Sequence, residues 1–260
     1  MFNATHFIYN SKSSAEYDLH ILDFDTGSVV ETDAFSPTLV LQKVPGSLRF
    51  LHGGIEYDSA PTCEFSVLSQ SEITATKRSE ILSWLIGRKQ FKPLQFVNGD
   101  NGDFTYYCVF TSARTIWVNG RCHGFRLTAQ FDSQFARGTP VEVEVPSSND
   151  IVIKTINNQS NLGDEYTYPI VSFWGTSIEI YNLTDDPAKK RPFKFESLNS
   201  DEYVTVDNEV KHITSTTGDV RLANFTSKKW LRLRPGENEL SIYAPGGAKI
   251  ICPTYVMIGY

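Results

Sequence analysis

The chain has 260 residues, of which 40% are hydrophobic and 21% are charged, and its formal net charge is −6. This composition is ordinary for a soluble protein, and the length suffices for one large or two medium cores, so we expect two domains. The sequence has no run of about 18 apolar residues that would span a membrane. Residues 1–6 lack the basic start of a secretion signal, so we expect a protein made in a cytoplasm.

The charge is spread over both halves of the chain. Residues 1–138 carry 12 basic and 14 acidic side chains, and residues 139–260 carry 12 and 16. A protein that grips nucleic acid by its phosphates normally has a basic excess, so this balance predicts no specific nucleic-acid binding. The longest basic run, Lys189-Lys190-Arg191, follows two acids and a proline and is interpreted as a solvated loop.

The first part of the chain is predicted to form short strands. The apolar runs that indicate them are residues 6–9, 17–25, 38–44 and 63–68. Pro45-Gly46 predicts the turn that ends the third of these strands, and His52-Gly53-Gly54 predicts a further turn.

The one convincing helix is predicted at residues 79–87. Its large apolar side chains recur at helical spacing, at Ile81, Leu82 and Leu85. Gly87 can adopt a left-handed conformation and end the helix. Upstream, Thr74 or Ser71 is the candidate N-cap.

Two hairpins are predicted after the helix. Strands at residues 91–97 and 104–111 are joined by residues 98–103, whose two Asn-Gly steps favour a turn because both residue types tolerate positive φ. Pro93 has no amide proton, so we expect its strand at a sheet edge. The second hairpin joins residues 115–118 and 125–131 around Asn119-Gly120. In residues 125–131 apolar and polar side chains alternate, which predicts one buried face.

Residues 136–140 interrupt this pattern, and we place the domain boundary there, giving domains at residues 1–138 and 139–260. Residues 146–150 are the alternative boundary. The first domain is predicted to be mostly β with one helix. The second has no convincing helix, and its many short strands predict a β-sandwich. These strands are residues 141–145, 151–156, 168–173, 177–182, 193–195, 203–206, 210–213, 230–233, 239–243, 249–252 and 256–259.

Two blocks of sequence carry a family resemblance. The first has a helix ending in Trp84-Leu85, a short basic link, and then Leu94-Gln95-Phe96, Gly102-Asp103 and Tyr106-Tyr107. It resembles the distal tail protein of long-tailed, non-contractile bacteriophages. The second is similar to the galectin-like C-terminal domain of that family, and it contains Asn161-Leu162-Gly163, Tyr168-Pro169-Ile170, Val204-Thr205-Val206-Asp207, Lys211-His212-Ile213 and residues 233–242. In the last of these, Pro235 and Gly236 predict a turn whose backbone Asn238 can hydrogen-bond.

The resemblance implies a mainly β protein, with a split-barrel-like N-terminal domain containing one α-helix and a galectin-like C-terminal β-sandwich. It implies a structural virion protein that is not an enzyme and needs no cofactor. Six copies would form a ring between the tail tube protein and the tail-tip hub protein, through which DNA passes. The C-terminal domains would project toward receptor-binding or adhesion proteins. The expected location is the phage tail tip or baseplate, after assembly in the host cytoplasm.

The ring implied by the resemblance leads to two hypotheses. The turns at residues 98–103 and Asn119-Gly120 would extend strand pairing to neighbouring subunits, because a cyclic ring needs two complementary surfaces on each copy. The acidic net charge suits a lumen that does not hold DNA phosphates.

No residue pattern points to a catalytic, cofactor or metal site. Asp23 and Asp25 would share one strand face near His20, but a metal site there lacks further ligands. The histidines lack zinc-binding spacing, and nucleophile-elbow, Walker and Rossmann motifs are absent. The adjacent acids Asp164-Glu165 and Asp185-Asp186 are interpreted as parts of turn-rich acidic loops rather than glycosidase carboxylates. The Asn-x-Ser/Thr triplets are interpreted as chance matches, and they begin at Asn3, Asn158, Asn182 and Asn224.

Carbohydrate binding by a lectin-like module is the alternative function. A galectin-like sandwich would present Trp174 or Trp230 to a sugar ring, but the His, Asn and Arg cluster of galectins is not recognisable. Both tryptophans are therefore predicted in the core. The four cysteines are predicted to be buried reduced thiols, with disulfides or a metal site as alternatives. They are Cys63, Cys108, Cys122 and Cys252.

Overall fold

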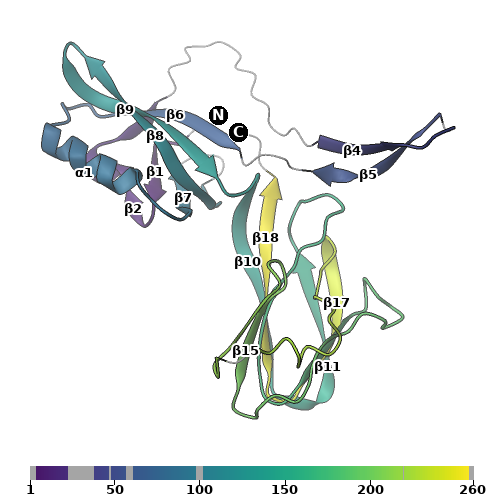
Figure 1. Cartoon of the computed structure of the whole chain (residues 1–260). Coiled ribbons are helices and arrows are strands. Elements are labelled where there is room, and N and C mark those ends of the chain that lie inside the picture. Colours follow the sequence, from purple (N-terminus) through teal and green to yellow (C-terminus); the bar gives the residue numbers. More distant parts are fainter. Residues whose placement is uncertain are drawn as a thin grey trace. The chain divides into compact units, whose positions relative to one another are not determined.

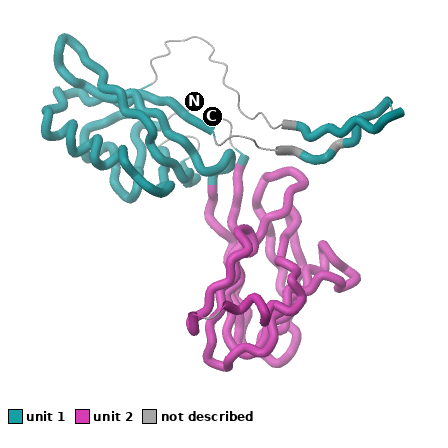
Figure 2. The backbone as a smooth tube through the Cα atoms, in the orientation of Figure 1, with its two compact units in different colours: residues 1–136, 257–260 teal, residues 137–256 magenta. Residues whose placement is uncertain are grey.

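The computed structural model describes residues 4–22, 38–46, 48–56, 61–97, 102–218 and 220–257. The chain divides into two compact units, unit 1 (Met1–Ala136 and Met257–Tyr260) and unit 2 (Arg137–Val256), which Figure 2 shows in two colours. Both units consist mainly of β-strands, and the described residues contain one α-helix, which confirms the predicted fold class (Figure 1). None of the described helices is long and apolar enough to cross a membrane.

Unit 1 contains a seven-stranded antiparallel sheet. In spatial order its strands are β2 (Lys12–Ser13), β1 (His6–Tyr9), β7 (Lys92–Val97), β8 (Tyr106–Val118), β9 (Arg121–Phe131), β6 (Thr62–Leu68) and β3 (His20–Leu22). The predicted strands at residues 104–111 and 115–118 are parts of the single strand β8. The predicted turn joins β8 to β9, with φ of 49° at Asn119 and 77° at Gly120. Every second residue from Phe125 to Phe131 is buried, as the alternation predicts.

Helix α1 (Ala75–Leu85) begins earlier than predicted because Thr74 caps it. The Thr74 hydroxyl accepts a hydrogen bond from the Lys77 amide at 3.3 Å. The buried face consists of Ile81, Trp84 and Leu85, so the prediction that places Leu82 on it is wrong: Leu82 is only half-buried. Gly87 follows the helix end with φ of 81°.

Trp84 is buried because the helix lies over an aromatic cluster. Its indole is nearly parallel to the Phe7 ring, at an angle of 4° and a centroid distance of 5.6 Å. It also stacks on Tyr17 at 5.5 Å. Tyr17 lies in the 3-10 helix η1 (Ser14–Tyr17), which a capping box at Ser13 stabilises. The strand predicted at residues 17–25 therefore begins only at His20, in β3, and residues 23–25 lie outside the described residues.

The prediction that Pro93 marks a sheet edge is wrong, because β7 lies between β1 and β8. Pairing of β7 with β1 begins at Leu94, whereas Pro93 pairs with Tyr107 on the other side. The Pro93 carbonyl accepts a hydrogen bond from Asn10, so the proline nitrogen also faces the β1 side, where β1 has already ended. No ladder hydrogen bond is lost there.

β4 (Thr38–Lys43) and β5 (Phe50–Glu56) form a separate two-stranded sheet. The predicted turn at Pro45-Gly46 joins them, with φ of 80° at Gly46. The turn predicted at residues 52–54 is wrong, since these residues lie within β5 opposite a register shift in β4. Glycine suits this bulge, because a Cβ at Gly53 would lie 3.0 Å from Val40 and Gly54 has φ of 129°.

Unit 2 is a sandwich of two sheets around one hydrophobic cluster. The five-stranded sheet has the order β10 (Phe135–Val145), β18 (Ala248–Met257), β12 (Ile170–Trp174), β15 (Tyr203–Asp207) and β16 (His212–Ser215). The four-stranded sheet has the order β11 (Ser148–Asn158), β17 (Gly236–Ala244), β13 (Ile178–Asn182) and β14 (Phe193–Phe195). Figure 1 shows β10 and β18 side by side.

Three predictions for the second half differ from the structure. Residues 136–140 do not interrupt the strands but belong to β10, an edge strand, where Pro140 is tolerated. Residues 230–233 form no strand, and Leu233 makes only an isolated bridge to Thr167. The two strands predicted at the C-terminus are parts of the single strand β18 up to Met257.

Candidate functional site

The metal-site hypothesis at Asp23 and Asp25 concerns residues outside the described part of the chain. Within the described residues, no group of three or more His, Cys, Asp or Glu side chains is placed to hold a metal ion. His20 lies 3.4 Å from the Asp18 carboxylate, which also accepts a hydrogen bond from the Ser69 hydroxyl at 2.7 Å. These groups tie η1 and β3 to the chain that follows β6.

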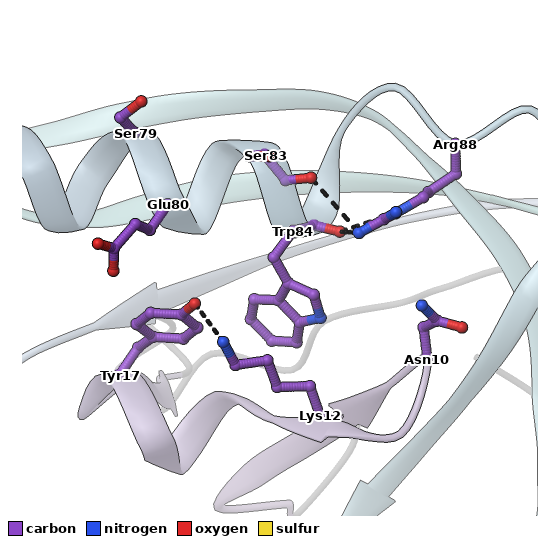
Figure 3. Close-up of a pocket in the computed structure, with 8 residues that line it drawn as sticks. All are labelled: Asn10, Lys12, Tyr17, Ser79, Glu80, Ser83, Trp84 and Arg88. Atoms are coloured by element: carbon purple, nitrogen blue, oxygen red, sulfur yellow. Dashed lines mark hydrogen bonds between the residues drawn. The ribbon is translucent and has the colours of Figure 1, made fainter.

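An open hollow of about 710 Å³ lies between η1 and α1 in unit 1 (Figure 3). Its lining residues are Asn10, Lys12, Tyr17, Ser79, Glu80, Ser83, Trp84 and Arg88. Lys12 lies 4.2 Å from the centre of the Tyr17 ring and donates a hydrogen bond to the Tyr17 hydroxyl. Arg88 donates to the carbonyl oxygen of Trp84 at 2.8 Å and so caps the end of α1.

The side chains that line this hollow contact one another and form no recognisable catalytic group. Its lining residues include no His or Cys, and they supply no hydroxyl paired with a base. The two cationic groups, Lys12 and Arg88, are already engaged by the protein itself. We therefore assign no catalytic role to it.

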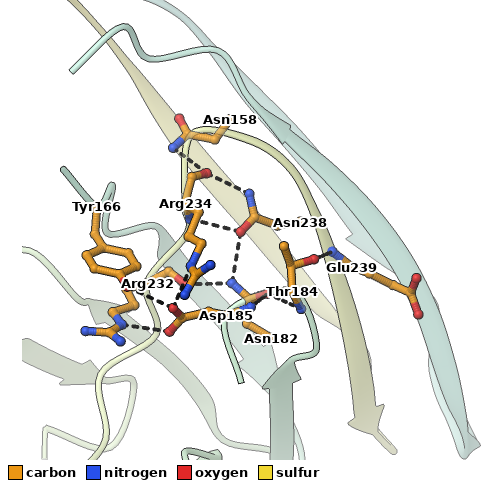
Figure 4. Close-up of polar contacts among 9 residues, drawn as sticks. All are labelled: Asn158, Tyr166, Asn182, Thr184, Asp185, Arg232, Arg234, Asn238 and Glu239. Carbon is orange, nitrogen blue, oxygen red and sulfur yellow. Dashed lines mark hydrogen bonds and ion pairs between the residues drawn. The ribbon is translucent and has the colours of Figure 1, made fainter. Parts of the chain in front are cut away.

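Asp185 is the centre of a buried ion-pair cluster in unit 2 (Figure 4). Its side chain is 3% exposed and accepts hydrogen bonds from Arg232 at 2.8 Å, Arg234 at 2.9 Å and Tyr166 at 2.9 Å. Burial alone would raise the pKa of this carboxyl, but these hydrogen bonds outweigh burial and lower the pKa below its usual value. Asp185 lies in a turn, as predicted, but its side chain is buried and paired with arginines.

Buried asparagines hold the neighbouring turn together. Asn238 accepts a hydrogen bond from the Arg234 amide at 2.9 Å and donates to the carbonyl oxygens of Arg234 and Gly236 at 2.8 and 2.9 Å, which confirms its predicted role. Asn158 also donates to the Arg234 carbonyl, and Asn182 donates to Asn238, both at 3.0 Å. Two of the Asn-x-Ser/Thr triplets thus begin at buried residues, since Asn158 and Asn182 are 2% and 5% exposed.

Glu202 is a second buried carboxylate, at the start of β15. Its side chain is fully buried and lies 2.5 Å from the Arg221 guanidinium and 2.5 Å from the Ser215 hydroxyl. Burial would raise the pKa of this carboxyl, but the hydrogen bonds from Arg221 and Ser215 lower it overall. The contact holds the chain that follows β16 against β15.

The two candidate sugar-stacking tryptophans lie in different surroundings. Trp230 packs against the core of unit 2, 4.9 Å from the Phe225 ring, as predicted. Trp174 is 46% exposed, so its prediction as a core residue is wrong. Strand alternation decides this, because Phe173 of β12 is buried and its neighbour Trp174 lies on the outer face.

Unit 1 exposes apolar side chains on two hairpins. At the end of the β8–β9 hairpin, Trp117 and Val118 are 54% and 48% exposed. In the β4–β5 hairpin, side chains from both strands and the turn are more than half exposed, namely Leu39, Leu41, Leu48, Phe50 and Leu51. A two-stranded hairpin without further cover is only marginally stable, and clustered exposed apolar groups indicate contact surfaces.

The cysteines are free thiols, and all except half-buried Cys63 are buried. Burial raises the pKa of Cys63 to about 11 and that of Cys252 to about 12. The reactive thiolate is therefore scarce at neutral pH, and these residues act as small apolar groups.

The sequence analysis missed the Asp185 cluster and the exposed apolar surface of the β4–β5 hairpin. Asp185 is separated from Arg232 by 47 positions, so no local pattern links them. The hairpin residues Phe50 and Leu51 resemble ordinary core residues until the structure shows that nothing in the described chain covers them.

Two family models match the chain. Residues 2–133 match a model described as a phage tail protein N-terminal domain, and residues 135–252 match one described as a phage tail C-terminal domain. No curated protein sequence is significantly similar to the chain.

Solved phage structures share the fold. The Dit protein (gp 19.1) of phage SPP1, described as a paradigm of the hub adsorption apparatus of phages that infect Gram-positive hosts, has a TM-score of 0.68 and 17% identity. The similarity covers 96% of this chain and 98% of that one. A chain of the phage p2 baseplate in its activated conformation has a TM-score of 0.52 and 9% identity, over 95% and 97% of the two chains.

Proposed function

The chain belongs to the phage tail protein family, and from this premise we propose that it is a distal tail protein that acts by assembly and catalyses no reaction. Six copies form a ring between the tail tube protein and the tail-tip hub protein. The similarity to the fold of the SPP1 hub protein along nearly the whole chain supports this assignment.

The observation that carries the proposal is the exposed apolar surface of the β4–β5 hairpin. Neither strand pairs with another described strand, and Phe50 and Leu51 are 60% and 57% exposed. Burial of apolar surface stabilises a protein by about 25 cal/mol per Å², so side chains left in water do not contribute this stabilisation. A neighbouring copy that covers the hairpin would recover it.

A cyclic ring requires two different complementary surfaces on each subunit. The β4–β5 hairpin supplies one candidate surface. The β8–β9 hairpin supplies the other, because Trp117 and Val118 extend beyond the buried part of the sheet. The turn at residues 98–103, the other predicted contact, falls largely outside the described residues.

The proposed ring lets DNA pass without holding it. The net charge of −6 gives no general attraction for phosphate. We expect weak binding to double-stranded DNA in a mobility-shift assay at moderate salt, and tight binding would contradict an inert lumen.

The proposed location is the tip of the phage tail, after assembly in the host cytoplasm. Unit 1 (proposed domain 1–138) makes the ring, and unit 2 (proposed domain 139–260) projects outward as a galectin-like sandwich toward adhesion or receptor-binding proteins. Neither unit needs a cofactor in this role.

Electron microscopy of the purified protein, combined with light scattering, tests the ring. We expect sixfold rings and a mass of six chains. A protein that stays monomeric at high concentration, and also inside assembled particles, would refute the proposal.

Carbohydrate binding by unit 2 is a second candidate function, which can coexist with the ring. The specific observation that favours it is the exposure of Trp174 on the outer face of the five-stranded sheet. A rise in melting temperature with added sugar would support it.

A further inference from the structure

The outer face of the five-stranded sheet in unit 2 carries an aromatic pair. Trp174 ends β12, and the Tyr203 ring of β15 meets it edge-on, with 5.2 Å between ring centroids and an interplanar angle of 80°. Their chain neighbours Phe173 and Val204 lie in the core. The Trp174 indole, which is 46% exposed, therefore presents apolar surface to solvent and is supported from the side by Tyr203.

A row of polar side chains crosses the same face beside this pair. Ser172 is paired with Lys249 of β18 on one side and with Thr205 of β15 on the other. The hydroxyls of Ser172 and Thr205 are 3.0 Å apart, and the Lys249 ammonium lies 2.6 Å from the Glu142 carboxylate. Two strand positions separate Ser172 from Trp174, so the row begins about 6.5 Å along the strand from the indole.

The main chain beneath the indole is held on both sides. The Trp174 amide donates to the Gly247 carbonyl at 3.2 Å, and the Gly175 amide donates to the Glu202 carbonyl at 3.3 Å. A Cβ at Gly246 would lie 2.3 Å from the Trp174 carbonyl oxygen, so only glycine permits this approach. A platform held in this way loses little conformational freedom on binding a ligand.

We propose that this face binds a neutral saccharide, a proposal that rests on the second candidate function. The C–H face of a pyranose stacks on Trp174. Its hydroxyls exchange hydrogen bonds with the Lys249–Glu142 pair and with the Thr205 hydroxyl, while Ser172, which is 7% exposed, holds the Thr205 hydroxyl in place.

The charged side chains on this face favour a neutral ligand over an acidic one. Lys249 is neutralised by Glu142, and Glu144 adds a further negative charge two positions along β10. Acidic saccharides and single-stranded nucleic acid, which would also stack on an indole, are disfavoured by this acidic rim.

The test uses the full chain on a printed array of neutral hexose and N-acetylhexosamine oligosaccharides beside carboxylated and sulfated ones. We expect retention on neutral members only. Titration calorimetry with the tightest neutral oligosaccharide then measures the site. We expect Trp174→Ala to weaken binding at least about tenfold, as for a central aromatic anchor, and Glu142→Gln to weaken it less.

Tyr243→Ala is the matched control, because it removes a half-buried aromatic from β17 in the other sheet. We expect its affinity to equal that of the wild type. The proposal is overturned if the wild type binds no neutral oligosaccharide at millimolar concentration, if only charged members are retained, or if Trp174→Ala binds as tightly as the wild type. Electron microscopy of the same samples distinguishes the saccharide site from the ring. A protein that forms rings but binds no sugar refutes the saccharide site and leaves the ring intact.

Discussion

The indole nitrogen of Trp84 donates a hydrogen bond to the main-chain oxygen of Tyr9 at 3.1 Å, across 75 positions of sequence. The same indole stacks on Phe7, so one side chain joins α1 to β1 by both a polar and an apolar contact. This contact holds the helix against the sheet of unit 1.

Replacing Trp84 with Phe removes the hydrogen bond and part of the buried ring. We expect a loss of about 2 kcal/mol, from about 1 kcal/mol for the bond and a similar amount for the smaller ring. Urea unfolding followed by circular dichroism measures it. Trp117→Phe changes an exposed tryptophan and should stay within about 0.5 kcal/mol of the wild type. Equal losses in both variants would contradict this role for Trp84.

Gly124 in β9 lies against the backbone of β6. A Cβ there would lie 2.1 Å from the Val67 carbonyl oxygen, so Gly124→Ala must push two paired strands apart. We expect a loss of about 1–3 kcal/mol, as for overpacked sites. The comparison is Gly120→Asn at the open turn, where φ is 77° and Asn is tolerated. Thermal melts measure the effect. If Gly124→Ala melts at the same temperature as the wild type, the close approach of the two strands is unimportant.

Asp185→Asn leaves Arg232 and Arg234 without their buried counter-charge. At neutral pH we expect a loss of about 1–3 kcal/mol in the unfolding free energy of unit 2, less than for a fully buried pair because Arg232 and Arg234 are 26% and 50% exposed. Glu237→Gln alters an exposed acid near the start of β17 and should cost little.

The same substitution predicts a pH effect with a definite sign. The pKa of Asp185 is lower in the folded chain than in the unfolded chain, where it is about 3.9. Its stabilisation is therefore complete above about pH 5 and is lost as the pH falls through the unfolded and then the folded pKa. We expect the stability gap between wild type and Asp185→Asn to narrow between pH 5 and pH 2. Urea midpoints across this range measure it, and a gap that widens in acid contradicts the assignment.

The Glu202–Arg221 ion pair predicts local rather than global loosening. Arg221→Ala removes the guanidinium 2.5 Å from a fully buried carboxylate, a contact that joins residues 216–218 and 220–228 to the start of β15. We expect faster amide hydrogen exchange in those residues, while β12 stays protected. Faster exchange throughout unit 2 would mean that the pair supports the whole sandwich.

The β4–β5 hairpin predicts an assembly phenotype. Phe50→Ser with Leu51→Ser should leave each subunit folded but shift rings toward monomers, because the exposed apolar surface is removed. Light scattering measures the loss of rings, and circular dichroism shows whether each subunit stays folded. Leu222→Ser, at an exposed leucine of unit 2, is the chemical control. Intact rings in the double variant would exclude this hairpin from the interface.

Local chemistry made much of the fold predictable. The alternation from Phe125 to Phe131 identified a half-buried strand, and Asn119-Gly120 identified its hairpin turn, because a pleated strand and a tight turn each depend on a few adjacent residues. Asn238 was assigned to its turn for the same reason. The side-chain alternation and the turn residues act over a few adjacent positions, so the sequence by itself determined the strand and its turn.

Tertiary structure decided what depends on distant partners. β7 is interior although Pro93 favours an edge, since β1 ends just short of the proline. Asp185 is buried because Arg232 and Arg234, far along the chain, neutralise it. Trp174 is exposed because the β12 register directs Phe173 into the core. Burial of a charge and the choice of strand face are properties of the packed neighbours, and those neighbours exist only once the sheets have formed.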